Sequence, residues 1–207
     1  MDDNSIDYVI TDPPHGDRQP YLELSMLWNT WLGFECDFEN ELVISNAKTR
    51  NKNVENYNKL LIKIISQIER VLKPGKYFTL MFNSLDNATW KNLQKTLYGM
   101  DMNIVDIATV DYSATSVVQD NRDVGLKTDF AFTFKKHQNN RKAGYRQVEL
   151  EHLKEMTHSL MQQYSKRNDQ ARPYEILNYT VTSLMNDRIV FDLGIILKLL
   201  KKDVPIQ

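Results

Sequence analysis

The chain of 207 residues contains one cysteine and no long apolar run. The single thiol of Cys36 excludes an internal disulfide, and one thiol without clustered histidines makes a poor metal site. A membrane-spanning helix needs about 20 consecutive apolar residues, so we expect no membrane partner. Residues 1–10 are acidic and enter a strand pattern at once, which is not typical of a signal peptide. These absences predict a reducing, cytoplasmic setting and no bound metal.

The chain also has almost no net charge, because its 26 basic and 27 acidic side chains nearly cancel. Without a global basic field, the composition argues mildly against a protein that wraps duplex nucleic acid by itself. Two local basic stretches, residues 48–52 and 135–146, are candidates for a basic groove. Solvated loop charge is the alternative interpretation of both stretches.

The sequence does contain an alternation of strand and helix patterns. Apolar, β-branched runs predict four strands, at residues 7–11, 76–82, 103–112 and 129–135. Apolar side chains at three- and four-residue intervals predict three helices, at residues 21–32, 54–72 and 87–97. This alternation predicts an α/β fold with a mainly parallel sheet, although the last two strands can instead form an antiparallel hairpin.

The composition changes after about residue 141, and the rest of the chain carries two helical patterns, at residues 148–164 and 173–185, while residues 188–200 end in the apolar run IILKLL. We therefore divide the chain into an α/β region, residues 1–140, and a helical C-terminal extension, residues 141–207. The extension is either a packing appendage or a small unit that recognises a target or a partner.

The most informative segment is Asp12-Pro13-Pro14-His15, which follows the first predicted strand. Two prolines cannot continue a strand ladder, so the chain must leave the sheet there. Ligands of open parallel sheets bind beyond the carboxyl ends of the strands, which makes this segment a candidate site. A proline-rich turn without a function is the alternative.

In its context this segment resembles a known motif. Residues 6–17 (IDYVITDPPHGD) are similar to the DPPY segment of the N6-adenine and N4-cytosine DNA methyltransferases. A long helix, VLKPGKYFTLMF and VGLKTDFAFTFKK follow in the family's order, up to residue 136. The resemblance implies the C-terminal half of a Rossmann-like class I methyltransferase sheet, with S-adenosyl-L-methionine as cofactor and DNA as partner.

The resemblance also implies a catalytic set of Asp12, Pro13, Pro14 and His15. An exocyclic amine on a base is a weak nucleophile, because its lone pair is delocalised into the ring. The Asp12 carboxylate and the Pro13 carbonyl would accept the two amine hydrogens, which favours the pyramidal form that attacks a methyl group. Asp12 and Pro13 are also the expected cofactor-binding residues, and the two prolines stiffen the loop.

Position 15 departs from the family, in which a tyrosine usually stacks on the base that is flipped out of the duplex. Imidazole also stacks, but it is smaller than phenol and becomes a cation when it is protonated. We consider three explanations. His15 is a natural variant that still stacks, it marks a weakened or inactive enzyme, or it is an engineered change.

A second departure is the lack of the glycine-rich turn on which enzymes of this fold bind their cofactor. Among only seven glycines, Gly194 in the run Phe-Asp-Leu-Gly comes nearest, and we interpret that run as part of a helix. We therefore expect a catalytic half that needs a missing N-terminal methyltransferase half or a partner subunit and binds the cofactor weakly alone. Without that half, one edge of strand 7–11 would stand open.

Other residues give weaker signals. Asn83 and Ser84 end the second strand and either line the base pocket or cap the strand end. Residues 113–127 are the candidate loop for contact with DNA.

Two further pairs receive a structural interpretation. We interpret Trp28 and Trp31 as core residues and not as wedges in DNA. Lys127 and Asp129 flank the last predicted hairpin, and we interpret them as a solvated pair without a function.

The predicted function is methylation of an exocyclic base amine in DNA, with adenine N6 favoured over cytosine N4. One alternative is a non-catalytic module, derived from a methyltransferase, that binds DNA or protein. Another is a base methyltransferase acting on RNA, since some enzymes that modify guanine in transfer RNA carry a similar segment. The intact Asp12-Pro13-Pro14 favours an enzyme, whereas His15 and the missing glycine-rich turn favour the module.

Overall fold

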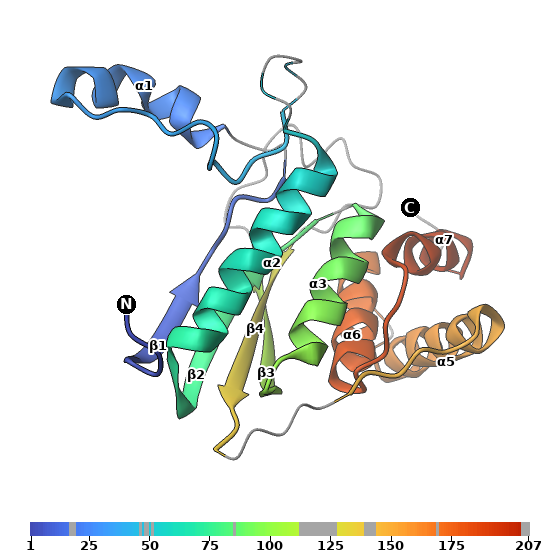
Figure 1. Cartoon of the computed structure of the whole chain (residues 1–207). Helices are drawn as coiled ribbons and strands as arrows, with labels where there is room; N and C mark the ends of the chain where they lie inside the picture. The colour runs from blue at the N-terminus through green and yellow to red at the C-terminus, as the bar shows by residue number, and fades with distance from the viewer. Residues whose placement is uncertain are drawn as a thin grey trace.

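The computed structural model describes residues 1–16, 20–45, 47, 50, 52–84, 86–111, 128–138, 144–168 and 170–203. In this part of the chain one open sheet holds four strands: β1 (Ile6–Thr11), β2 (Leu72–Phe82), β3 (Met102–Asp111) and β4 (Thr128–Lys136). Six helices accompany the sheet, so the fold is mixed α/β as predicted (Figure 1). None of the helices in these residues is long and apolar enough to cross a membrane.

The order of the strands across the sheet is β1-β2-β4-β3, so β4 lies between β2 and β3. β1 pairs parallel with β2, whereas β4 pairs antiparallel with both of its neighbours. The antiparallel alternative for the last two strands is therefore confirmed. The prediction of a mainly parallel sheet is wrong for the pairing, because two of the three strand pairs in the described sheet are antiparallel. β1, β2 and β3 run the same way, end at one rim of the sheet, and meet the start of β4 there.

Helix α2 (Val54–Val71) forms where the apolar stripe predicts it, and Figure 1 shows it lying with α3 over one face of the sheet. The side chain of Asn53 caps α2 by accepting a hydrogen bond from the Asn56 amide at 2.9 Å. β2 begins directly after α2, at Leu72, which is four residues earlier than predicted. Gly75, at φ +76°, lies in the irregular stretch where the pairing with β1 jumps by several residues, so the Pro-Gly pair sits in a bulge.

The core is centred on an aromatic cluster around Trp90 of helix α3 (Asn87–Gly99). The Trp90 ring lies 5.8–6.2 Å from the rings of Phe82, Phe130, Phe132 and Phe191. These four rings come from β2, from β4 and from the segment before the last helix. One side chain therefore joins the sheet to the end of the chain.

Helices α5 (Leu150–Arg167), α6 (Pro173–Asn186) and α7 (Leu193–Asp203) pack against one another and against α3 and β3. Their buried side chains belong to the same core cluster as those of the sheet. The run around Gly194 is helical, as interpreted, because it opens α7. A Cβ on Gly194 would lie 2.6 Å from Asn87 Nδ2, so glycine permits a close contact with α3.

Asp192 fixes the start of α7 against α3. Its Oδ1 accepts the Gly194 amide at 2.9 Å and its Oδ2 pairs with Lys91 Nζ at 2.7 Å. Burial alone would raise the pKa of Asp192, but the hydrogen bonds from Lys91 and from backbone amides outweigh it and lower the pKa.

The interpretation of Trp28 and Trp31 as core residues is wrong. Helix α1 (Tyr21–Leu32) forms as predicted, but it projects away from the sheet and buries no residue (Figure 1). Trp28 is 60% exposed and Trp31 is 79% exposed. The spacing of apolar residues shows that a helix has an apolar face, but it does not show that the face meets a core.

Two described residues of the basic stretch 48–52, Arg50 and Lys52, hold the chain segment that returns from α1. Arg50 pairs with Glu23 at 2.6 Å and lies over the ring of Phe38. Lys52 is buried, and its Nζ donates to the carbonyls of Glu39 and Glu41. Both side chains are thus paired and not simply solvated loop charge, and they line one pocket with Lys59, so a basic groove here stays a prediction.

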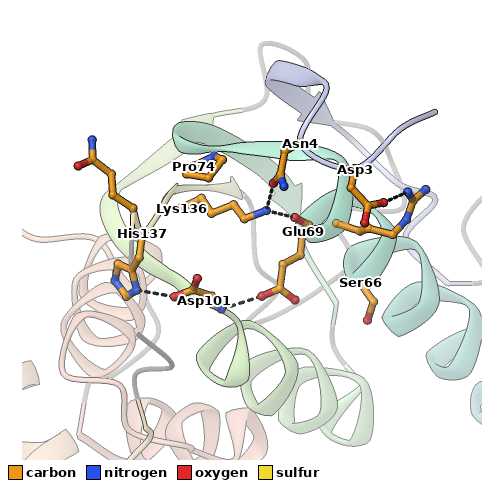
Figure 2. A pocket seen from close by; sticks show the side chains of 10 residues that line it. Asp3, Asn4, Ser66, Glu69, Pro74, Asp101, Lys136 and His137 are labelled. Atoms are coloured by element: carbon orange, nitrogen blue, oxygen red, sulfur yellow. Dashed lines mark hydrogen bonds and ion pairs between the residues drawn. The ribbon is translucent and has the colours of Figure 1, made fainter. Parts of the chain in front are cut away.

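The other basic stretch contributes Lys136, which closes the amino end of the sheet (Figure 2). Its Nζ donates to Asn4 Oδ1 at 3.0 Å and to the carbonyls of Glu69 and Leu72 at 2.6 and 2.7 Å. These carbonyls lie at the end of α2, where no helical amide satisfies them. Lys136 thus ties β1, α2 and β4 together and caps a helix.

Replacement of Lys136 by methionine removes this donor and keeps the aliphatic stem. We expect Lys136→Met to lower the free energy of unfolding by about 1–3 kcal/mol, measured by urea denaturation, because carbonyls near the end of α2 lose a charged partner. Lys154→Met, at an exposed pair with Glu151, is the matched control and should change stability by less than about 1 kcal/mol. Equal losses in the two variants would contradict the capping role.

Candidate active site

The segment Asp12-Pro13-Pro14-His15 follows β1 directly, at the rim where β1, β2 and β3 end. The side chain of Asp12 is 58% exposed, so its carboxylate faces outward from the end of the strand. Pro13 is buried behind it. The predicted position of this segment, beyond the carboxyl end of a strand, agrees with the structure.

The loop is held from two further elements. The Pro14 carbonyl accepts hydrogen bonds from the Gly16 amide at 3.1 Å and from the Tyr57 hydroxyl of α2 at 2.5 Å. The Gly16 carbonyl accepts the Ile44 amide at 3.1 Å. Gly16 has φ +72°, and an added Cβ would lie 3.2 Å from Ile44 Cδ1, so a larger residue would strain this anchor. The turn is therefore fixed at its far end while Asp12 stays exposed.

His15 lies between two carboxylates that come from different strands. Its Nε2 lies 3.1 Å from Asp12 Oδ1, and its Nδ1 lies 3.9 Å from Asp129 Oδ1. The imidazole meets the ring of Phe82 edge-on, with centroids 5.5 Å apart, and its side chain is only 9% exposed. In this position the imidazole presents little surface on which a planar ligand can stack.

Asp129 is the residue that the sequence interpretation missed. Its side chain is only 11% exposed, so the description of Asp129 as half of a solvated pair is wrong. Phe82 pairs with Phe130 across the sheet, which brings Asp129 to the rim beside the end of β1. Its partner in that interpretation, Lys127, lies outside the described residues, as does the whole predicted contact loop 113–127.

Asn83 and Ser84 leave β2 at the same rim. Asn83 is fully buried, and Ser84 is half-buried. The Ser84 hydroxyl accepts the Asp86 amide at 3.2 Å, and its carbonyl accepts the indole N–H of Trp90. These contacts are those of a residue that caps the end of a strand; a role for either residue in a base pocket stays a prediction.

The outer side of β1 is open in the described sheet. β1 is a terminal strand, and the side chains of Tyr8 and Ile10 are exposed. The C-terminal helices pack beside β3, at the opposite end of the sheet, and so do not cover this edge. Among the described residues, no cluster of three or more histidine, cysteine or carboxylate side chains could hold a metal ion.

The chain is thus a mixed α/β protein whose candidate site is a fixed acidic turn at the end of a terminal strand. It belongs to the DNA methylase family of N6 and N4 methyltransferases, whose family model matches residues 6–187. That match confirms the family to which the turn and the downstream segments are similar.

Comparison with other proteins adds little beyond the family. No curated protein shows significant similarity to the chain. Two solved structures of TTHA0409 from Thermus thermophilus, provisionally named a DNA modification methylase, match with TM-scores of 0.34 and 0.36 and identities of 12% and 10%. The matches cover 76% and 99% of this chain, which spans 55% of the first of those chains and 90% of the second.

Removal of the Tyr57 hydroxyl should loosen the turn. We expect Tyr57→Phe to cost about 0.5–1.5 kcal/mol of unfolding free energy, because the partly buried Pro14 carbonyl loses a donor. Hydrogen exchange should also become faster at the Gly16 and Ile44 amides. Tyr179→Phe removes an exposed hydroxyl that contacts Gln163 and serves as control. Unchanged exchange at Gly16 in Tyr57→Phe would show that the hydroxyl does not hold the loop.

Proposed function

We propose that this chain is the catalytic half of an S-adenosyl-L-methionine-dependent methyltransferase that modifies an exocyclic base amine in DNA, with adenine N6 favoured over cytosine N4. The observation that carries the proposal is the exposed Asp12 carboxylate on a turn that α2 and the Ile44 segment hold in place. Membership of the DNA methylase family supports it. In this proposal residues 1–140 form the catalytic region and residues 141–207 the helical extension.

The chemistry assigned to the turn is acceptance of two hydrogens. The Asp12 carboxylate and the Pro13 carbonyl would each accept one hydrogen of the amine, which localises the lone pair on nitrogen as the new bond forms. Because Pro13 and Pro14 restrict the backbone and Tyr57 anchors it, these acceptors need little reorganisation. The target base must leave the duplex to reach them, at a cost of a few kcal/mol.

We further propose that His15 positions Asp12 and does not stack on the base. The imidazole is nearly buried and lies between Asp12 and Asp129, so it restricts the rotamers of the Asp12 carboxylate. Asp129, in turn, restrains the imidazole from the opposite side. Under this proposal a histidine at position 15 is a working variant of the family's tyrosine, with a different task.

The cofactor would supply the methyl group and lie beside Asp12 and Pro13. The described residues offer only one wall of such a site, because the chain has no glycine-rich turn and the described sheet has no strand outside β1. We propose that an N-terminal methyltransferase half or a partner subunit adds strands to the open β1 edge. The result would be a Rossmann-like sheet with a complete cofactor site.

The test of function is transfer of labelled methyl groups to duplex DNA by the full-length or reconstituted protein. We expect Asp12→Asn to lower kcat by about 100-fold or more, because an acceptor that acts in the transition state is lost. Asp7→Asn, an exposed carboxylate near the other end of β1, is the matched control and should keep full activity. Transfer to RNA but not to DNA, or full activity of Asp12→Asn, would refute the proposal.

A second pair of variants separates positioning from stacking. If His15 positions Asp12, His15→Tyr should lower kcat about tenfold or more despite restoring the family's residue, because the carboxylate loses its fixed orientation. Asp129→Asn should lower kcat in the same direction with an unchanged KM for DNA. If His15 stacks on the base, His15→Tyr would instead retain or raise activity, and Asp129→Asn would have no effect on kcat.

A further inference from the structure

Helix α1 has a wide apolar face, as helices that pack in a core do, but none of its residues is buried. Seven of its large apolar side chains are more than half exposed: Tyr21, Leu24, Met26, Leu27, Trp28, Trp31 and Leu32. At 3.6 residues per turn all of these except Met26 fall on one side of the helix within about 140°, and we call these six the α1 patch. A stripe of this width is typical of a helix that packs against another element.

Part of the other side of α1 is already occupied. The Leu22 amide donates to Glu41 Oε1 at 3.0 Å, and Asn29 contacts Cys36 Sγ at 3.2 Å, so the returning segment packs along the polar stripe. Arg50 pairs with Glu23 and strengthens this attachment. These contacts on the other side of α1 hold the helix so that the α1 patch faces away from the sheet.

The charge of α1 argues against two classes of occupant. Glu23 is its only charged residue, and residues 34–41 add four more carboxylates and no basic side chain. A surface that binds nucleic acid needs cations for the phosphates, and a helix that lies on a membrane usually carries lysine or arginine on its polar face. The uncharged apolar patch itself fits an uncharged apolar surface of another protein molecule.

The size of the patch matches one half of a protein interface. Its three aromatic residues are 54–79% exposed and offer roughly 300–500 Å², and the three leucines bring the total to roughly 600–800 Å². A standard interface buries about 800 Å² per partner, and a typical monomer exposes no apolar patch larger than about 600 Å². Trp28 and Trp31 meet edge to face at 6.1 Å in the patch, as aromatic anchors of an interface do.

We propose that the α1 patch is the interface of a symmetric dimer of this chain. An uncharged apolar face is complementary to itself, and a two-fold axis across α1 would pair the patch with the same patch of a second copy. The helix projects from the body and so presents the patch away from the sheet (Figure 1). This inference does not depend on the proposed function.

Sedimentation equilibrium of the chain tests the proposal. We expect a dimer with a Kd in the micromolar range or below, and the double variant Leu27→Glu and Trp31→Glu should raise that Kd by about 100-fold or more. Leu150→Glu removes an exposed apolar side chain of α5 outside the patch and should leave the Kd unchanged. Circular dichroism of the double variant should match that of the wild type, since α1 buries no residue in the monomer.

Tryptophan fluorescence gives a second measurement. Trp90 is fully buried in the monomer, so any change of emission on dilution reports Trp28 and Trp31. We expect a shift to longer wavelength as the dimer dissociates. The proposal is overturned if the wild type stays monomeric, if the double variant dimerises like the wild type, or if Leu150→Glu dissociates the dimer equally well. Patch-dependent binding of DNA or vesicles by a monomeric chain would also overturn it.

Discussion

The hydrogen bond from the Tyr57 hydroxyl to the Pro14 carbonyl is the constraint on which the candidate site depends. A turn with two prolines has no amide with which to hold itself to the sheet at those positions, so its place must be fixed through its carbonyls. Tyr57 can do this because α2 packs over the sheet and leaves one buried tyrosine at the level of the strand ends. The acidic residue before the prolines then stays exposed without being mobile.

Most of the regular structure could be predicted from local patterns. The boundaries predicted from the stripe of α2 and from the strand runs differ from the structure by at most one residue, except at the start of β2. The early start of β2 escaped prediction because a proline and a glycine normally end an element, and here they lie in a bulge. Local patterns predict whether a segment is a helix or a strand better than they predict which element it packs or pairs with.

The site was predictable only where it is continuous in sequence. Asp12 and the two prolines stand out because they are consecutive and resemble the family's motif. Asp129 lies more than one hundred residues away, and it reaches His15 only because β4 inserts next to β2. The exposure of Trp28 and Trp31 was not predictable for the same reason, since the sequence does not show whether the apolar face of a helix packs against another element.

The insertion of β4 between β2 and β3 also governs the order in which the chain is completed during synthesis. When β3 has left the ribosome, the edge of β2 that will receive β4 is still unpaired, and it stays so until residue 136 has emerged. A direct pairing of β2 with β3 would be a kinetic trap in that interval. The native sheet therefore forms only if this edge of β2 stays free until β4 has emerged.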